Sequence, residues 1–232
     1  MRQKNDPSAS EVEVLYRQTA PVVFKLAFVH ASRVKGAREI LKKTYLYLAA
    51  NPMAFAAAQE DPVLVYQTAD RFCRQFYQEK LRRKMKKGDF EEMQLPFPSD
   101  NLLPVLRLPA ACKSAFVLTA LAFSPEQIAV ILSISPEQLE KQLAAADHFL
   151  AGGKSPVSRE TALLAVTRAE PDPAFYRRQS DSISVAMAER GFRPVQRLKS
   201  AKRWLDSHVF YIALLLLLIF VLAYLGVEYH WF

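Results

Sequence analysis

The 232-residue sequence is poor in the residues that usually build small reactive or metal-binding centres. It has two cysteines, Cys73 and Cys112, no CxxC pair and four scattered histidines, so a zinc site is not expected. Glycine is also scarce, and neither a glycine-rich phosphate loop nor a nucleophile–base motif is present. These absences argue against an enzyme, and no cofactor is expected. Two reduced thiols packed in a core explain the cysteines.

Alternation of apolar and polar residues, which marks a half-buried β-strand, is scarce as well. Helix-forming residues dominate, so the expected fold class is all-α, with two small helical domains and a transmembrane helix. The expected order is a helical domain at 1–87, a linker at 88–100, a helix-turn-helix domain at 101–150, a basic juxtamembrane segment at 151–207 and a transmembrane helix at 209–227.

The uncharged stretch VFYIALLLLLIFVLAYLGV, residues 209–227, predicts the membrane span. At ~1.5 Å per residue it covers about 28 Å, close to the ~30 Å hydrocarbon core of a bilayer. Only Glu228 is charged beyond it, whereas residues 190–203 are strongly basic, so the positive-inside rule places the bulk of the chain in the cytoplasm and a short C-terminus outside.

The basic run before the span is expected to lie on anionic headgroups of the cell membrane, with nucleic-acid contact as the alternative. Its cations are Arg190, Arg193, Arg197, Lys199, Lys202 and Arg203.

Several stretches of residues 11–169 predict helices. GAREILKKTYLYLAANP, residues 36–52, places Ile40, Leu41, Tyr45 and Leu48 on one stripe. A long helical run begins after Asp61-Pro62, and ETALLAVTRA, residues 160–169, predicts a short helix. PDPAFYRRQSDS, residues 171–182, is expected to be a loop.

The tetrapeptide SPEQ occurs twice, eleven residues apart, at 124–127 and 135–138. In each copy Ser can cap a helix, Pro suits the first helical position and Gln can close a capping box. The pattern therefore predicts two helices joined by a tight turn, a helix-turn-helix. Its core is expected to consist of Ile128, Ile131, Leu132, Leu139, Leu143, Ala146 and Leu150.

This layout resembles bacterial sigma factors of the extracytoplasmic-function group over residues 10–150. Residues 13–52 and 61–84 are similar to the start and the later helix of sigma region 2, which in that family reads the −10 promoter element. Residues 103–150 are similar to region 4, which reads the −35 element. The resemblance implies RNA polymerase core, or another transcription regulator, as the partner, together with promoter DNA.

The charge is distributed unlike that of the family. Near GAREILKK, where the family usually carries an acidic patch for polymerase docking, Glu39 is surrounded by Arg38, Lys42 and Lys43. Residues 1–95 hold 17 Lys/Arg and 11 Asp/Glu, whereas residues 96–150 hold 3 and 5. Because DNA affinity depends on cations that neutralise phosphates, the first domain has the stronger electrostatic case for DNA contact.

The candidate DNA-binding residues follow from this distribution. Interleaved Phe72, Phe76 and Tyr77 suit melted DNA, whose bases stack on aromatic rings, or else belong to a core beside a solvated helix end. The candidates are Arg71, Arg74, Lys80, Arg82, Arg83, Lys84, Lys86 and Lys87, with Gln138, Lys141 and Gln142 in the expected recognition helix.

Two functions are consistent with these features. The first is a membrane-anchored, sigma-factor-like transcription regulator that acts on RNA polymerase and promoter DNA. The alternative is a degenerate, sigma-derived protein-interaction module at the membrane that no longer initiates transcription.

Overall fold

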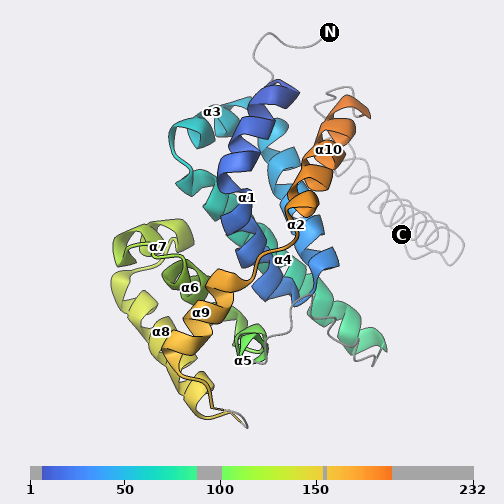
Figure 1. Ribbon diagram of the computed structural model, residues 1–232. Coiled ribbons are helices and arrows are strands. Elements are labelled where there is room, and N and C mark those ends of the chain that lie inside the picture. Colours follow the sequence, from blue (N-terminus) through green and yellow to red (C-terminus); the bar gives the residue numbers. More distant parts are fainter. Residues whose placement is uncertain (1–6, 88–100, 154–155, 190–232) are drawn as a thin grey trace, which may run out of the picture. The chain divides into compact units, whose positions relative to one another are not determined.

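The structure is a computed structural model that describes residues 7–87, 101–153 and 156–189, without the side chains of residues 79–87. Every regular element in these residues is a helix, which confirms the all-α prediction. The helices in Figure 1 are α1 (Ala9–Ala31), α2 (Val34–Ala49), α3 (Pro52–Glu60), α4 (Val63–Lys87), α5 (Leu102–Leu106), α6 (Ala110–Ala120), α7 (Pro125–Leu132), α8 (Pro136–Ala151), α9 (Arg159–Arg168) and α10 (Pro173–Glu189).

Helix α1 lies at the centre of the packing. It begins with a capping box, in which Ser8 Oγ accepts a hydrogen bond from the Glu11 backbone N–H at 3.2 Å and Glu11 accepts one from the Ser8 N–H at 2.6 Å. Its second half, from Val23 to Ala31, is buried on every face, because α2, α4, α6 and α10 all pack against α1. This surrounding explains why that half of the helix is mostly apolar on every face, with Lys25 and His30 as its buried polar residues.

Helices α2 and α4 complete the bundle around α1. The predicted stripe of α2, from Ile40 to Leu48, is buried, as its helical periodicity indicates. At the start of α2 the helices approach closely: a Cβ atom on Gly36 would lie 2.6 Å from the Ala31 Cβ and 2.9 Å from Cζ of Phe76. Glycine at this position therefore allows α1, α2 and α4 to meet.

Helices α7 and α8 form as the repeated SPEQ predicts. Ser124 Oγ accepts from the Gln127 N–H at 3.3 Å, and Ser135 Oγ accepts from the Gln138 N–H at 3.2 Å. In each box the glutamine Oε1 atom accepts a second hydrogen bond from the serine N–H. The turn between the helices passes through Ser133, whose φ of 53° is left-handed. Of the predicted core, Leu143 is half-buried, and the buried members are Ile128, Ile131, Leu132, Leu139, Ala146 and Leu150.

The segment after α8 differs from the prediction in one part. The short helix expected at 160–169 is confirmed as α9. The prediction of a loop at 171–182 is wrong, because α10 begins at Pro173. Asp172 starts this helix by accepting a hydrogen bond from the Ala174 N–H at 2.9 Å. Phe175 is then buried against Phe24 of α1, with ring centroids 5.1 Å apart. Burial against α1 outweighs the polar, proline-containing local sequence.

The predicted membrane features lie outside the described residues. This holds for the transmembrane helix at 209–227 and for the basic run at 190–203. The predicted linker at 88–100 also lies outside the described residues. Within the described residues, none of the helices combines the length and the apolar character that a membrane span requires.

Candidate functional site

The expected recognition helix, α8, exposes little positive charge. Lys141 forms an exposed ion pair with Glu137 of the same helix at 2.7 Å. Gln138 uses its side-chain oxygen to close the capping box with Ser135, and Gln142 is half-buried with its Oε1 atom out of reach of any partner in the described chain. The three polar candidates on α8 are therefore occupied locally or turned partly inward.

The candidates at the start of the basic stretch of α4 are also engaged. The Arg71 guanidinium lies 4.5 Å from the ring centroid of Tyr47 and 5.1 Å from that of Phe72. Arg74 Nε donates to Asp70 Oδ2 at 2.7 Å, one turn earlier on the same helix. The remaining candidates lie on the same helix, beyond the side chains that the structure describes: Lys80, Arg82, Arg83, Lys84, Lys86 and Lys87.

The aromatic residues between these cations contact protein. Phe76 is buried, and Phe72 packs edge-on against Tyr47 with centroids 5.8 Å apart. The Lys113 ammonium lies 5.8 Å from the Tyr77 ring centroid. In this conformation the packing agrees with the core interpretation of these rings rather than with base stacking.

A buried polar network, which the sequence did not suggest, joins α1, α4 and α6. Ser114 of α6 donates a hydrogen bond to Asp70 of α4. On its other side, Ser114 Oγ lies 2.8 Å from Nε2 of His30 on α1. His30, Asp70 and Ser114 are each at most 5% exposed, and Arg74 completes the network at its edge. Each of the three helices thus contributes one buried polar side chain.

Burial shifts the protonation equilibria of this network. The pKa of His30 is lowered to about 3, mainly by desolvation and then by the positive charges of Lys113 and Arg74. Desolvation also raises the pKa of Asp70, against hydrogen bonds from Ser114 and Arg74 that favour the carboxylate. The arrangement holds a neutral imidazole in the core of the described helices, and its Nδ1 atom has no hydrogen-bond partner in the described chain.

The same three residue types occur in nucleophilic triads, but their order here differs. In a triad the imidazole lies between the serine and the carboxylate and takes the serine proton. Here Ser114 lies between His30 and Asp70 and donates its hydroxyl hydrogen bond to the carboxylate. All three side chains are buried, so a substrate cannot reach the hydroxyl in this conformation. The contacts describe a link between helices.

Two buried lysines tie helix ends together. Lys113 Nζ donates to the carbonyls of Val29, near the end of α1, at 2.9 Å and of Leu106, at the end of α5, at 2.8 Å. Lys25 of α1 donates to the Thr167 carbonyl near the end of α9 at 2.7 Å and pairs with Glu170 at 3.1 Å. A cation at a helix C-terminus donates hydrogen bonds to free carbonyls and interacts favourably with the negative end of the helix dipole.

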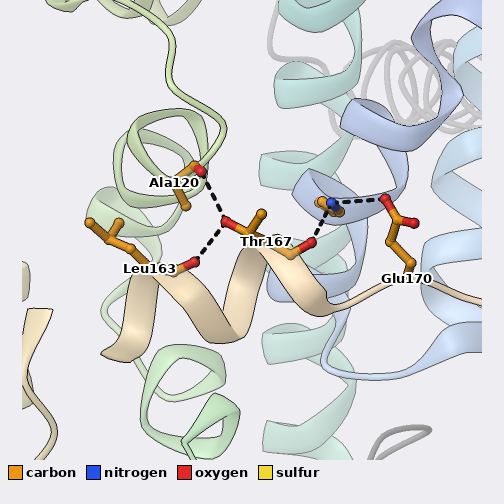
Figure 2. A network of polar contacts seen from close by, with 5 residues as sticks. Ala120, Leu163, Thr167 and Glu170 are labelled. Atoms are coloured by element: carbon orange, nitrogen blue, oxygen red, sulfur yellow. Dashed lines mark hydrogen bonds and ion pairs between the residues drawn. The ribbon is translucent and has the colours of Figure 1, made fainter. Parts of the chain in front are cut away.

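Thr167 extends the second of these junctions to α6. Its hydroxyl oxygen lies 3.1 Å from the Ala120 carbonyl oxygen and, within α9, 3.0 Å from the Leu163 carbonyl oxygen, so the one hydroxyl hydrogen is shared between the two acceptors. Figure 2 shows Thr167 between Ala120 and Leu163, with Glu170 on the segment that leads toward α10. Residues near the end of α9 therefore contact both α1 and α6.

One sequence signal would have found part of the buried network. Asp70 follows Tyr66 by four residues and precedes Cys73 by three, so it lies on the buried stripe of α4. A charged residue at an apolar position predicts a buried partner, although not which residue supplies it. Both Cys73 and Cys112 are buried and free, which confirms the prediction of packed thiols. In the described part of the chain no group of His, Cys, Asp or Glu side chains is arranged for a metal ion.

Comparisons with protein-family models, with curated proteins and with solved structures found no match to this chain.

Proposed function

We propose that this chain is a membrane-anchored transcription regulator of the sigma-factor type that acts through a protein partner, with RNA polymerase core as the first candidate. The observation that carries the proposal is the pair of capped helices α7 and α8, whose outer face exposes Glu137, Glu140 and a lysine already paired with an acid. The helix pair has the form of a DNA-reading element, but its exposed charge favours a protein contact.

Protein contact is also favoured by the state of the two arginines at the start of the basic stretch. Arg71 is stacked on two rings and Arg74 is paired with a buried carboxylate, so each would lose a partner if it moved to a phosphate. Any DNA contact by α4 falls instead to its last two turns, which hold the cations from Lys80 to Lys87.

The membrane part of the proposal rests on the sequence. The uncharged residues 209–227 and the basic run at 190–203 support a single span with the helical region on the cytoplasmic side. A regulator held there would meet its partner at the inner surface of the cell membrane.

The second candidate is an interaction module derived from a sigma factor that no longer initiates transcription. The local engagement of Gln138 and Lys141 favours it, because these two side chains are not free to contact bases in this conformation.

Affinity purification of the full chain from detergent-solubilised membranes tests the proposal. We expect RNA polymerase subunits to co-purify, and transcription in vitro from candidate promoters then separates the two candidates. The triple variant R82A/R83A/K84A tests the last turns of α4: promoter binding that is lost in this variant, but kept in Lys141→Ala, assigns DNA contact to α4. Recovery of the chain without any polymerase subunit contradicts the first candidate.

A further inference from the structure

Helix α10 lies along α1 and α2, as Figure 1 shows. An aromatic cluster anchors its first turn: the Phe175 ring is 5.1 Å from that of Phe24, and the Tyr176 ring is 6.1 Å from that of Phe24. Farther along, Ile183 and Met187 are buried on the same face. The helix therefore covers an apolar strip of the α1–α2 surface.

The surface beneath α10 is cationic. The Arg38 guanidinium of α2 lies 5.8 Å from the Phe175 ring centroid, and Lys42 Nζ of α2 donates to Ser182 Oγ at 3.0 Å. Within the described residues neither cation has a carboxylate partner, so α10 offers them a ring and a neutral hydroxyl. A carboxylate would be a stronger partner for Lys42 than a hydroxyl.

The interface also leaves polar atoms unsatisfied. Tyr16 of α1, and Tyr176 and Gln179 of α10, each bury a side-chain oxygen that has no hydrogen-bond partner in the described chain. Gln179 is 4% exposed and lies four residues from both Phe175 and Ile183, on the inner face of the helix. A buried oxygen without a partner opposes burial, so α10 is held less tightly than its apolar contacts alone would hold it.

We propose that α10 is a displaceable cover over a docking face on α1 and α2, and that this face takes an acidic amphipathic helix from a protein partner. A better-suited helix has an aromatic residue at the position of Phe175, an apolar residue in place of Gln179 and a carboxylate in place of Ser182. Such a helix satisfies Lys42 and removes an unpaired oxygen. The inference deepens the proposed function, on which it rests for the identity of the partner.

Native-state hydrogen exchange of the full chain tests the cover. We expect amides of α10 to exchange through an opening that leaves α1, α2 and α6 protected. Gln179→Leu and Tyr176→Phe remove unpaired oxygens and should each lower the α10 opening constant about fivefold or more. Ser182→Glu should lower it about twofold or more by pairing with Lys42. Tyr47→Phe is the matched control, because Tyr47 of α2 packs against Phe72 of α4. This substitution should leave the α10 opening constant unchanged.

The docking face is tested with a synthetic peptide of residues 172–189 that carries Gln179→Leu and Ser182→Glu. The full-length Phe175→Ala variant, in which the tethered α10 is weakened, should bind this peptide at least tenfold tighter than the original chain. The double variant Phe175→Ala/Lys42→Ala should bind the peptide more weakly than the Phe175→Ala variant. Protection of α7 and α8 in the same exchange experiment shows whether the Phe175→Ala variant is folded.

Two results overturn the inference. One is an α10 that opens only together with α1, with no response to Gln179→Leu, Tyr176→Phe or Ser182→Glu. The other is a peptide that binds both chains equally or binds neither. These measurements need no polymerase and no DNA. A failure to recover polymerase would therefore contradict the proposed function without affecting the conclusion about α10.

Discussion

His30, Asp70 and Ser114 show how single polar residues are retained in an apolar core. Each is buried, and each finds a partner on a different helix. Because removing one partner leaves another buried group unsatisfied, the three residues are energetically coupled. Burial also shifts the pKa values of His30 and Asp70, and these shifts make the stability of the protein depend on pH.

Neutral His30 should stabilise the fold at pH 7 and lose this effect in acid. Its pKa in the folded chain is about 3, against an ordinary value of 6.5, so as pH falls below 6.5 the unfolded chain takes up a proton that the folded chain does not. The free energy of unfolding should then fall more steeply than that of a His30→Gln variant, by up to about 1.4 kcal/mol per pH unit. Urea unfolding between about pH 7 and pH 4 measures the difference.

Comparing the two chains cancels the titrations of groups that lie outside the network. Asp70, whose raised pKa acts in the opposite direction, keeps its bonds to Ser114 and Arg74 in both chains. His148→Gln, at an exposed position in α8, controls for the loss of a surface histidine. Parallel pH curves for the original chain and the His30→Gln variant would contradict the prediction.

Gly36 is a second residue on which the packing depends. Gly36→Ala places a methyl group 2.6 Å from the Ala31 Cβ, so α2 must move away from α1 and α4. We expect a loss of about 1–3 kcal/mol in the free energy of unfolding, measured by urea denaturation. Gly152→Ala is the matched control, because its added Cβ meets only the His148 carbonyl, at 3.2 Å, and it should be much milder. Equal effects of the two substitutions would show that close approach is not the reason for Gly36.

Helix ends are the features that local sequence specifies best in this protein. The two SPEQ copies form capping boxes, and the same signal at Ser8 and Glu11 begins α1. These bonds form between residues three apart, so they need no contact from elsewhere in the chain. This explains why the predicted starts of α7 and α8 are confirmed.

Ser135→Ala should destabilise α8 by about 1 kcal/mol, because the Gln138 N–H loses its acceptor. Ser135→Thr keeps a hydroxyl oxygen and should recover most of that loss. Hydrogen exchange of the first turn of α8 provides the measurement, with α1 as the internal reference. A Ser135→Thr variant as unstable as Ser135→Ala would indicate that the cap does not hold the turn.

Helix α10 shows the opposite dependence. Its first half, PAFYRRQSDS, begins with Pro173, follows Pro171 by two residues and has a polar composition, so local signals predicted a loop. The helix gains its stability from burial of Phe175, Ile183 and Met187 against other helices. Such contacts join residues more than a hundred positions apart and cannot be read from neighbouring residues.

The described helices belong to one compact unit. Hydrogen bonds link α1 to α6 through His30 and Ser114, and α4 to α7 through Gln67, whose Nε2 donates to the Val130 carbonyl at 3.0 Å. The two helical regions predicted on either side of residues 88–100 therefore contact each other, and the bond between His30 and Ser114 is buried.

This sharing predicts cooperative unfolding. We expect the most protected amides of α1, α4 and α6 to exchange with one common opening free energy and one denaturant dependence. Ser114→Ala should lower that value by about 1–3 kcal/mol in all three helices, since Asp70 loses its donor. Thr119→Ala, which removes a hydroxyl bonded within its own helix, is the control. Helices α6 to α8 opening at a lower free energy than α1 and α4 would instead support two independent domains.

Residue order alone determined the all-α class, the two SPEQ-capped helices, the buried stripe of α2 and the packing of the two cysteines in the core. Each of these depends on composition, helical periodicity or bonds between near neighbours. The tertiary structure decided which polar residues meet, such as His30 with Ser114, that Arg71 and Arg74 are engaged within the protein, and that residues from Pro173 form a helix. These outcomes depend on burial between distant segments, where desolvation makes every polar group require a partner that only the folded chain supplies.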